Sequence, residues 1–512
     1  MDLTATDEQK LICGCPLNKG TNVLIRAYAG SGKSTTLRLL SETYGRLRFL
    51  YLCFNNSVAT EARSKFPRNV TPTTIHSLAY RHVKDWYPKT KTLGLDLRPM
   101  EIREHLSLAH NQASILVRNT LHSFLCSPDT EVSRHHLPPK AIARQETAAI
   151  ILEQTTRLWR MMRDAQSELP LSHDGYLKLF VERDPQVQQY DVILLDEGQD
   201  TNPVTAEYIR KQMGHGIACV VVGDHHQSIY GFRGAANFMQ EMQQLDGVQQ
   251  FQLATSFRLT GTVADIASDI LNAWKLDPVR ITGKQPPGRN KTRAFIARTN
   301  ATLMAEAERL IEQGTTKIHF AGTSEKDRFN PEKAYGFAEI LDIHHLRTGN
   351  PKEIRSLYIK RFASYQQIKD AADSAEAKDV ELAALVKFVE KRQDQVPDVL
   401  ARIQKAACGP ADAQITLSTA HRAKGLEWDF VTIAEDFMDL CDAPAFKEEL
   451  TADEFDQEIN LIYVAVTRSL GEISLPAHFL RWREAYLAGI VPEMSDRARR
   501  RLKVPHKFHT VG

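Results

Sequence analysis

Residues 22–35 read Asn22-Val23-Leu24-Ile25-Arg26-Ala27-Tyr28-Ala29-Gly30-Ser31-Gly32-Lys33-Ser34-Thr35. The apolar run at the start predicts a buried strand, and residues 36–44 predict a helix with apolar residues on one face. The glycines between them predict a turn whose backbone can approach a ligand without a Cβ in the way. A strand, a glycine-rich turn and a helix in this order predict a loop that binds the phosphates of a nucleoside triphosphate.

Single residues of this loop have the chemistry that a nucleotide requires. Lys33 can reach the β- and γ-phosphates, and the Ser34 hydroxyl can be a ligand of Mg²⁺. Loops of this type usually start with glycine, and Ala27 stands at that position here. We interpret the pattern as a phosphate loop and not as a glycine-rich turn with an incidental Lys-Ser pair.

Composition and charge narrow the class of protein. The 512 residues suffice for roughly three or four domain-sized units, and 65 basic against 63 acidic residues give a net charge of +2. This balance does not identify a nucleic-acid binder, but a local basic groove is compatible with it. No run of about 18 apolar residues is present, so we expect no membrane contact. From the polar N-terminus we expect no signal peptide, and seven scattered cysteines predict a reducing compartment, the cytoplasm or the nucleus.

Strands alternate with helices in two parts of the chain, which predicts two α/β domains with parallel sheets. Mainly helical segments interrupt both parts, and we interpret them as insertions. The predicted boundaries are 1–80 and 188–255 for the first α/β domain, 81–187 for its insertion, 256–334 and 411–490 for the second α/β domain, 335–410 for its small helical insertion, and 491–512 for a basic tail.

A second motif supplies the acids that a phosphate loop needs. Four apolar residues lead directly into Asp196 and Glu197. The first acid can hold Mg²⁺, and the second can activate the attacking water as a general base. Transfer of a γ-phosphoryl group also needs an arginine for the charge of the transition state, and Arg258 and Arg468 are the candidates.

The order of these motifs along nearly the whole chain resembles that of superfamily 1 DNA helicases of the UvrD-like type. In this group the phosphate loop commonly starts with alanine, as it does here. The resemblance implies two RecA-like P-loop domains. The matching segments are Gln9, 27–35, 53–56, 74–77, 196–200 with Gly198 where alanine is usual, 222–235, 419–427 and 463–468.

Within this group the chain is most similar to the F-box DNA helicase family, in segments 49–55, 76–80 and 173–179. No F-box fits ahead of Gln9, so we do not expect the ubiquitin-ligase role of that family. Fewer than 50 residues follow Arg468, so we also expect no C-terminal nuclease like that of related recombination helicases.

The resemblance implies ATP and Mg²⁺ as cofactors and a role for each matching residue. Asp196 and Ser34 would hold Mg²⁺, Glu197 would be the base, and Gln227 would sense the γ-phosphate. Thr35 stands where some relatives have an arginine that stacks on adenine. The other nucleotide contacts would come from Gln9 and Phe257 at adenine, Glu427 at ribose, Ala29, Gly30, Ser31, Gly32, Lys33, Ser34 and Thr35 at the phosphates, and Arg258 and Arg468 at the transition state.

The same resemblance implies a groove for single-stranded DNA. Aromatic side chains stack on any base, with about 1–3 kcal/mol for each base, which suits a motor that steps along arbitrary sequence. Phe232 is the strongest of the aromatic candidates. The residues that would line the groove are Phe54, Asn56, His76, Tyr230, Phe232 and His421.

We therefore expect a monomeric motor that moves 3′→5′ on single-stranded DNA and acts at duplex junctions. ATP would bind between the two α/β domains, and its hydrolysis would drive unwinding in DNA repair or recombination control. Three alternatives stay open at this point. The chain could be a translocase that strips proteins such as recombinases from DNA with little unwinding, a non-motor ATP-binding regulator, or an RNA motor.

Overall fold

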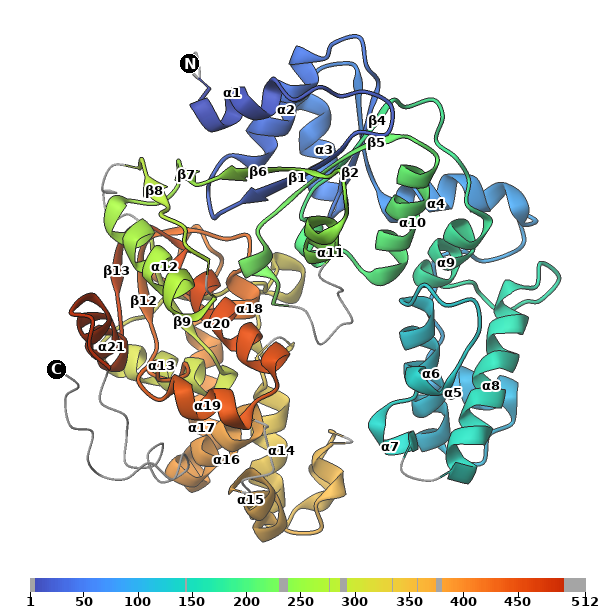
Figure 1. Ribbon diagram of the computed structural model, residues 1–512. Coiled ribbons are helices and arrows are strands. Elements are labelled where there is room, and N and C mark those ends of the chain that lie inside the picture. Colours follow the sequence, from blue (N-terminus) through green and yellow to red (C-terminus); the bar gives the residue numbers. More distant parts are fainter. Residues whose placement is uncertain are drawn as a thin grey trace. The chain divides into compact units, whose positions relative to one another are not determined.

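The computed structural model describes residues 5–142, 145–229, 238–275, 277–285, 292–333, 335–356, 358–373 and 380–491 (Figure 1). The chain divides into two compact units, residues 1–253 and 254–512. Each unit contains a parallel sheet with helices, so the predicted α/β class is confirmed. Almost all of the predicted basic tail lies outside the described residues.

The sheet of the first unit has six strands in the order β3-β2-β4-β5-β1-β6, and all neighbours are parallel. Strands β2, β4 and β5 are buried along their whole length, which is why their sequences are continuous apolar runs. The strands are β1 (Asn22–Ala27), β2 (Phe49–Cys53), β3 (Val70–Thr74), β4 (Val192–Leu195), β5 (Ala218–Gly223) and β6 (Gln249–Leu253).

The pleat of this sheet separates its side chains into two cores. Leu50 and Ile193 belong to one cluster of buried residues, and their neighbours Phe49 and Leu194 belong to the other. The first cluster also contains residues of α4 (Ile75–Val83), α9 (His173–Arg183) and α10 (Pro203–Gly214). The second contains residues of α1 (Asp7–Cys13), α2 (Lys33–Thr43) and α3 (Asn56–Lys65).

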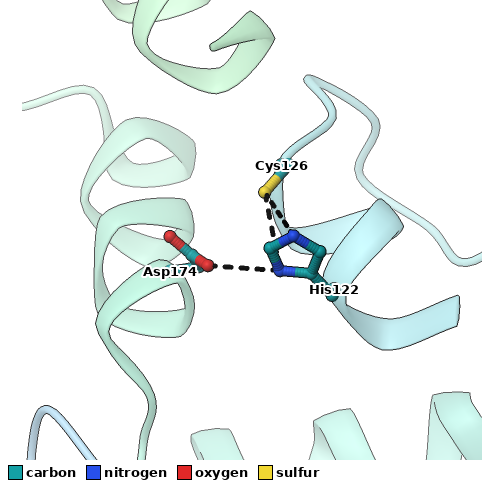
Figure 2. Close-up of side chains that lie close together, drawn as sticks. All are labelled: His122, Cys126 and Asp174. Atoms are coloured by element: carbon teal, nitrogen blue, oxygen red, sulfur yellow. Dashed lines mark hydrogen bonds and ion pairs between the residues drawn. The ribbon is translucent and has the colours of Figure 1, made fainter. Parts of the chain in front are cut away.

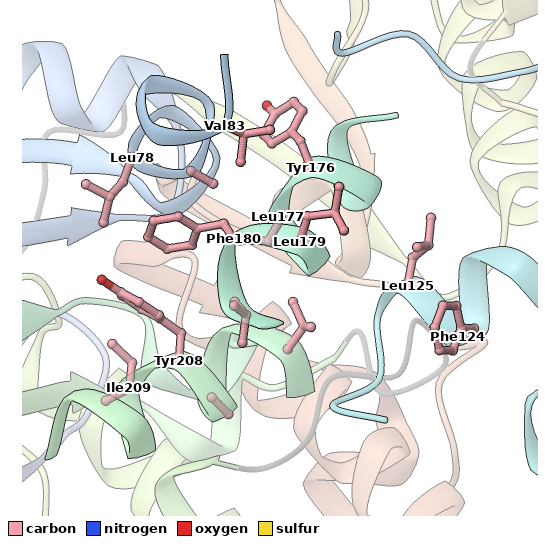
Figure 3. Packing of buried hydrophobic residues seen from close by; sticks show 14 of the residues in the cluster. Leu78, Val83, Phe124, Leu125, Tyr176, Leu177, Leu179, Phe180, Tyr208 and Ile209 are labelled. Atoms are coloured by element: carbon pink, nitrogen blue, oxygen red, sulfur yellow. The ribbon is translucent and has the colours of Figure 1, made fainter. Parts of the chain in front are cut away.

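The helices between β3 and β4 share the first of these cores. Helix α6 (Asn111–Leu125) packs against α5 (Pro99–Leu106) and α8 (Gln145–Arg163), and α7 (Pro139–Ile142) packs on α8. Figure 3 shows Phe124 and Leu125 of α6 in the same cluster as Phe180 of α9 and Tyr208 of α10. Helix α9 therefore connects this helical part to the helices on the sheet.

The second unit has a five-stranded parallel sheet in the order β10-β11-β9-β12-β13, and β7 (Thr255–Ser256) pairs with β8 (Thr282–Gly283). Its strands are β9 (Arg293–Ala297), β10 (Ile318–Phe320), β11 (Ile415–Thr419), β12 (Trp428–Ile433) and β13 (Ser469–Ser474). Ile318 and Leu417 share a core with helices α13, α14, α16 and α17. The helices are α12 (Gly261–Trp274), α13 (Asn300–Glu312), α14 (Phe337–Arg347), α15 (Tyr365–Asp373), α16 (Val380–Arg392), α17 (Val396–Ala406), α18 (Ala420–Ala423), α19 (Ala443–Glu449), α20 (Ala452–Val466) and α21 (Ala477–Leu487).

One local detail differs from the sequence interpretation. Helix α2 begins at Lys33 and not at Thr36, and Gly32 is its N-cap residue, in a left-handed conformation. Residues 75–77 form the first turn of α4, where the Thr74 hydroxyl accepts a hydrogen bond from the N–H of Ser77 at 3.1 Å. None of the helices in the described part of the chain has both the length and the apolar character needed to cross a bilayer.

Candidate active site

The loop after β1 has the geometry of an anion site. Gly30 and Gly32 have φ angles of 71° and 81°, a left-handed conformation that glycine adopts without strain. Among the described residues no side chain caps the N-terminus of α2, and the buried hydroxyl of Ser31 has no hydrogen-bond partner. The first-turn N–H groups, this hydroxyl and the helix dipole together favour a bound phosphate.

Lys33 and Glu197 form an ion pair in this loop, with 2.7 Å between Nζ and Oε1. Burial alone would lower the pKa of Lys33, but the carboxylates of Glu197 and Asp196 outweigh burial and raise it. Glu197 has a left-handed backbone with φ 51° and ψ 45°. Such a conformation costs a non-glycine residue about 1–3 kcal/mol and is typical of functional sites.

Asp196 is buried beside this pair. One of its carboxylate oxygens accepts a hydrogen bond from the Tyr51 hydroxyl at 2.6 Å, and the other accepts from the N–H of Glu197 at 2.9 Å. Burial is the main cause of the raised pKa of Asp196, the charge of Glu197 adds to it, and Lys33 opposes it. Burial and the charge of Asp196 raise the pKa of Tyr51, and the side chain of Ser34 lowers it. Ser34 and Asp196 thus both lie near Tyr51, a residue that the sequence analysis did not single out.

A chain of hydrogen bonds runs from Glu197 to Gln227. The Gln199 amide nitrogen donates to Glu197 Oε2 at 2.5 Å, and its oxygen accepts from the N–H of Asp224 at 3.0 Å. The Gln227 amide donates to Asp224 Oδ2 at 2.8 Å. Because Gln199 is both donor and acceptor, a carboxylate could not replace it. Gln199 and Asp224 lie within motifs that we quoted, but nothing in the sequence singled them out.

The packing around Gly198 explains why glycine stands at a position where the family motif usually has alanine. A Cβ on Gly198 would lie 2.6 Å from Val221 Cγ1 and 3.2 Å from Met239 Cγ. A Cβ on Gly223 would lie 2.2 Å from the amide oxygen of Gln199. Both glycines are therefore required by the close approach of the segment after β4 to the end of β5.

Gln9 lies where α1 meets the first turn of α2. Its amide oxygen accepts from the N–H of Thr6 at 3.1 Å, and its amide nitrogen donates to the Thr36 hydroxyl at 3.0 Å. These bonds fix the side chain at the base of the phosphate loop.

The second unit gathers the remaining predicted nucleotide residues. Arg258 pairs with Glu427 at 2.8 Å, and Phe257 beside it is 42% exposed. The guanidinium of Arg468 donates to the carbonyls of Val464 at 3.0 Å and Leu426 at 3.3 Å. Leu426 adjoins Glu427, so these bonds link the two arginines through residues 426–427.

Three of the predicted strand contacts lie at the ends of β2 and β3, which are neighbours. Phe54 follows β2 and is 59% exposed. Asn56 starts α3 and accepts a hydrogen bond from the Ser77 hydroxyl at 3.3 Å, and His76 is in the first turn of α4. His421 is in α18 of the second unit, whereas Tyr230 and Phe232 lie outside the described residues.

Substitution Gly198→Ala tests this packing. We expect it to lower the free energy of unfolding by about 1–3 kcal/mol, because the new Cβ must displace Val221. We also expect ATP hydrolysis to fall, because the shift disturbs Glu197 and Gln199. Denaturant unfolding and phosphate release measure both effects. The matched control is Gly214→Ala, where a Cβ meets nothing within 4 Å; equal effects of the two substitutions would contradict the steric account.

Comparison with known proteins identifies the family. Residues 6–246 match the UvrD/REP helicase N-terminal domain, and residues 251–475 match the UvrD-like helicase C-terminal domain. The chain is 30% identical to F-box DNA helicase 1 of Gallus gallus over 507 residues, which cover 91% of this chain and 48% of the relative. It is 29% identical to F-box DNA helicase protein 1 of Schizosaccharomyces pombe over 510 residues, which cover 91% of this chain and 56% of the relative.

A more distant similarity extends to bacteria. The chain is 23% identical to DNA helicase II of Escherichia coli over 301 residues, which cover 52% of this chain and 40% of the relative. The chain spans about half the length of the two F-box DNA helicases that it matches. Both matched domains occur in the order that the motifs predict. The chain belongs to the UvrD-like helicases.

Proposed function

We propose that this chain is an ATP-dependent DNA helicase that moves 3′→5′ on single-stranded DNA and acts at duplex junctions in DNA repair or recombination control. The main support is the chain of hydrogen bonds from Glu197 through Gln199 and Asp224 to Gln227. It connects Glu197, which pairs with Lys33 and would be the general base, to Gln227 in the motif that by resemblance couples ATP to DNA. The names of the matched relatives, which are DNA helicases, support DNA as the polymer.

In this proposal the loop after β1 holds the phosphates of ATP. The unpartnered Ser31 hydroxyl and the start of α2, which no side chain of the described residues caps, fit a triphosphate. Gln9 and Phe257 contact adenine, and Glu427 contacts ribose. Ser34 and Asp196 would hold Mg²⁺, since hydroxyl and carboxylate oxygens are the ligands that this ion prefers. The ion would neutralise charge on the β- and γ-phosphates.

Glu197 would then be the general base. Its carboxylate pairs with the Lys33 ammonium at the phosphate loop, and a carboxylate is the form of this side chain that accepts a proton from water. The phosphates of ATP would compete for the Lys33 ammonium and leave Glu197 to the attacking water. Arg258 and Arg468 would stabilise the charge of the transition state, a contribution worth about 10³–10⁵ in rate in related phosphoryl-transfer enzymes.

DNA would bind at the N-terminal ends of α3 and α4. These helices start at Asn56 and Ile75, beside each other at the ends of β2 and β3, and helix N-termini attract phosphate groups. Phe54 would stack on a base, with Asn56 and His76 beside it. His421 of the second unit would contact the same strand. Tyr230 and Phe232, which lie outside the described residues, are proposed as further base contacts.

ATP hydrolysis in the presence of DNA and RNA oligomers tests the proposal. We expect single-stranded DNA to stimulate phosphate release by the wild-type protein and RNA to do so less. Lys33→Ala should abolish the stimulation. Glu197→Gln should keep ATP binding and lose at least about 10²-fold in rate, because a general base contributes that much.

Stimulation by RNA alone would contradict the choice of polymer, and full activity of Lys33→Ala would contradict the whole mechanism. A strand-displacement assay beside a protein-displacement assay then separates unwinding from the stripping of proteins from DNA.

Substitution Phe54→Ala tests the strand site. The loss of one base stack should weaken binding of a single-stranded oligonucleotide by about 1–3 kcal/mol, with no preference for sequence. Fluorescence anisotropy with labelled oligomers measures this change. The control is Leu480→Ala, which also removes an exposed apolar side chain, in the second unit. Unchanged affinity of Phe54→Ala would remove Phe54 from the strand site.

A further inference from the structure

Three side chains with metal-binding chemistry converge in the helical part of the first unit (Figure 2). His122 lies in the last turn of α6, and Cys126 follows as its C-cap residue, four positions later and on the same face. Asp174 faces them from the first turn of α9. One ligand atom from each residue lies within 4.8 Å of the other two.

The distances between these atoms are long for hydrogen bonds. His122 Nδ1 lies 3.4 Å from Asp174 Oδ2, and Cys126 Sγ lies 3.9 Å from the same nitrogen. In a tetrahedral zinc site with ordinary bond lengths, the ligand atoms lie about 3.3 Å apart when they are N and O, and about 3.5 Å apart when they are N and S. A small movement of the Cys126 side chain would therefore place all three atoms around one ion.

The surroundings of Asp174 support the same conclusion. Its other oxygen, Oδ1, faces His76 Nε2 at 3.4 Å, so Asp174 can bind an ion through Oδ2 while His76 orients it. The His122 side chain is 62% exposed, so an ion can reach the cluster from solvent.

We propose that His122 Nδ1, Cys126 Sγ and Asp174 Oδ2 bind one Zn²⁺ ion, with water at the fourth position. A thiolate, an imidazole and a carboxylate form a donor set that suits Zn²⁺ and not Mg²⁺ or Ca²⁺. The ion would tie the end of α6 to the start of α9. This site shares none of its residues with the nucleotide site and only His76 with the proposed DNA contacts. Metal binding is measured without ATP or DNA, so its test does not depend on the proposed function.

A second cluster, Asp129 with His135 and His136, is less suited to a cation. Asp129 Oδ2 accepts from His135 at 2.6 Å and from His136 at 3.0 Å, so this oxygen is already engaged at shorter distances than Asp174 Oδ2 is. The Lys178 ammonium donates to the backbone carbonyl of the same aspartate and places a positive charge beside it. This cluster also contains no sulfur, which makes the two sites distinguishable by spectroscopy.

Metal titration of the full chain tests the proposal. After removal of metals with a chelator, the protein is titrated with Zn²⁺ by calorimetry and with Co²⁺ as a spectroscopic probe. We expect one ion per chain, a thiolate-to-Co²⁺ charge-transfer band, and weaker binding as the pH falls, because protons compete for the ligands. Cys126→Ser and His122→Asn should lose the band and the tight binding. His76→Asn should weaken binding about 10- to 100-fold.

The matched controls are Cys408→Ser, which removes another partly exposed thiol, and His135→Asn, which disrupts the second cluster. Both should bind like the wild type. Thermal unfolding of the metal-free variants verifies that each one folds. Absence of binding, binding without the thiolate band, or a band that survives Cys126→Ser in a folded protein would each overturn the proposal.

Discussion

The ion pair between Lys33 and Glu197 is the contact on which the organisation of the first unit depends. It joins the loop after β1 to the loop after β4, although β5 lies between these strands in the sheet. The Glu197 carboxylate, 2.7 Å away, offsets the free-energy cost of removing the Lys33 ammonium from water. Without this partner the cost would remain. Glu197 has a strained left-handed backbone, and its carboxylate nevertheless lies beside Lys33, so the surrounding contacts compensate for this strain.

The end of β5 contacts the loop after β4 through packing and hydrogen bonds. Gly198 and Gly223 leave space for each other's segments, and Gln199 uses both ends of its amide to connect Glu197 with Asp224. Since each residue in this chain of hydrogen bonds has a partner, a displacement of one residue strains the hydrogen bond to the next. This is the physical basis for proposing that nucleotide bound at Lys33 influences Gln227, in the motif that by resemblance couples ATP to DNA.

The sequence predicted much of this arrangement and left out the part that depends on tertiary contacts. Apolar runs before Gly30 and before Asp196 predicted β1 and β4, and parallel strands bring their ends to one edge of a sheet. Tyr51 could not be found in this way, because a tyrosine inside an apolar strand has the pattern of a core residue. His122 and Asp174 are 52 positions apart, and only the packing of α6 and α9 brings them together. The positions of Arg258 and Glu427 in the sequence likewise did not predict that these residues form an ion pair.

The most direct test of the account is the stimulation of ATP hydrolysis by single-stranded DNA in Gln199→Met. Methionine keeps the shape of glutamine but removes the donor to Glu197 and the acceptor for Asp224. The account predicts that the variant still binds ATP and single-stranded DNA, and that DNA stimulates its phosphate release at least tenfold less than in the wild type. Stimulation equal to that of the wild type in a folded Gln199→Met protein would contradict the claim that this hydrogen-bond chain couples the two sites.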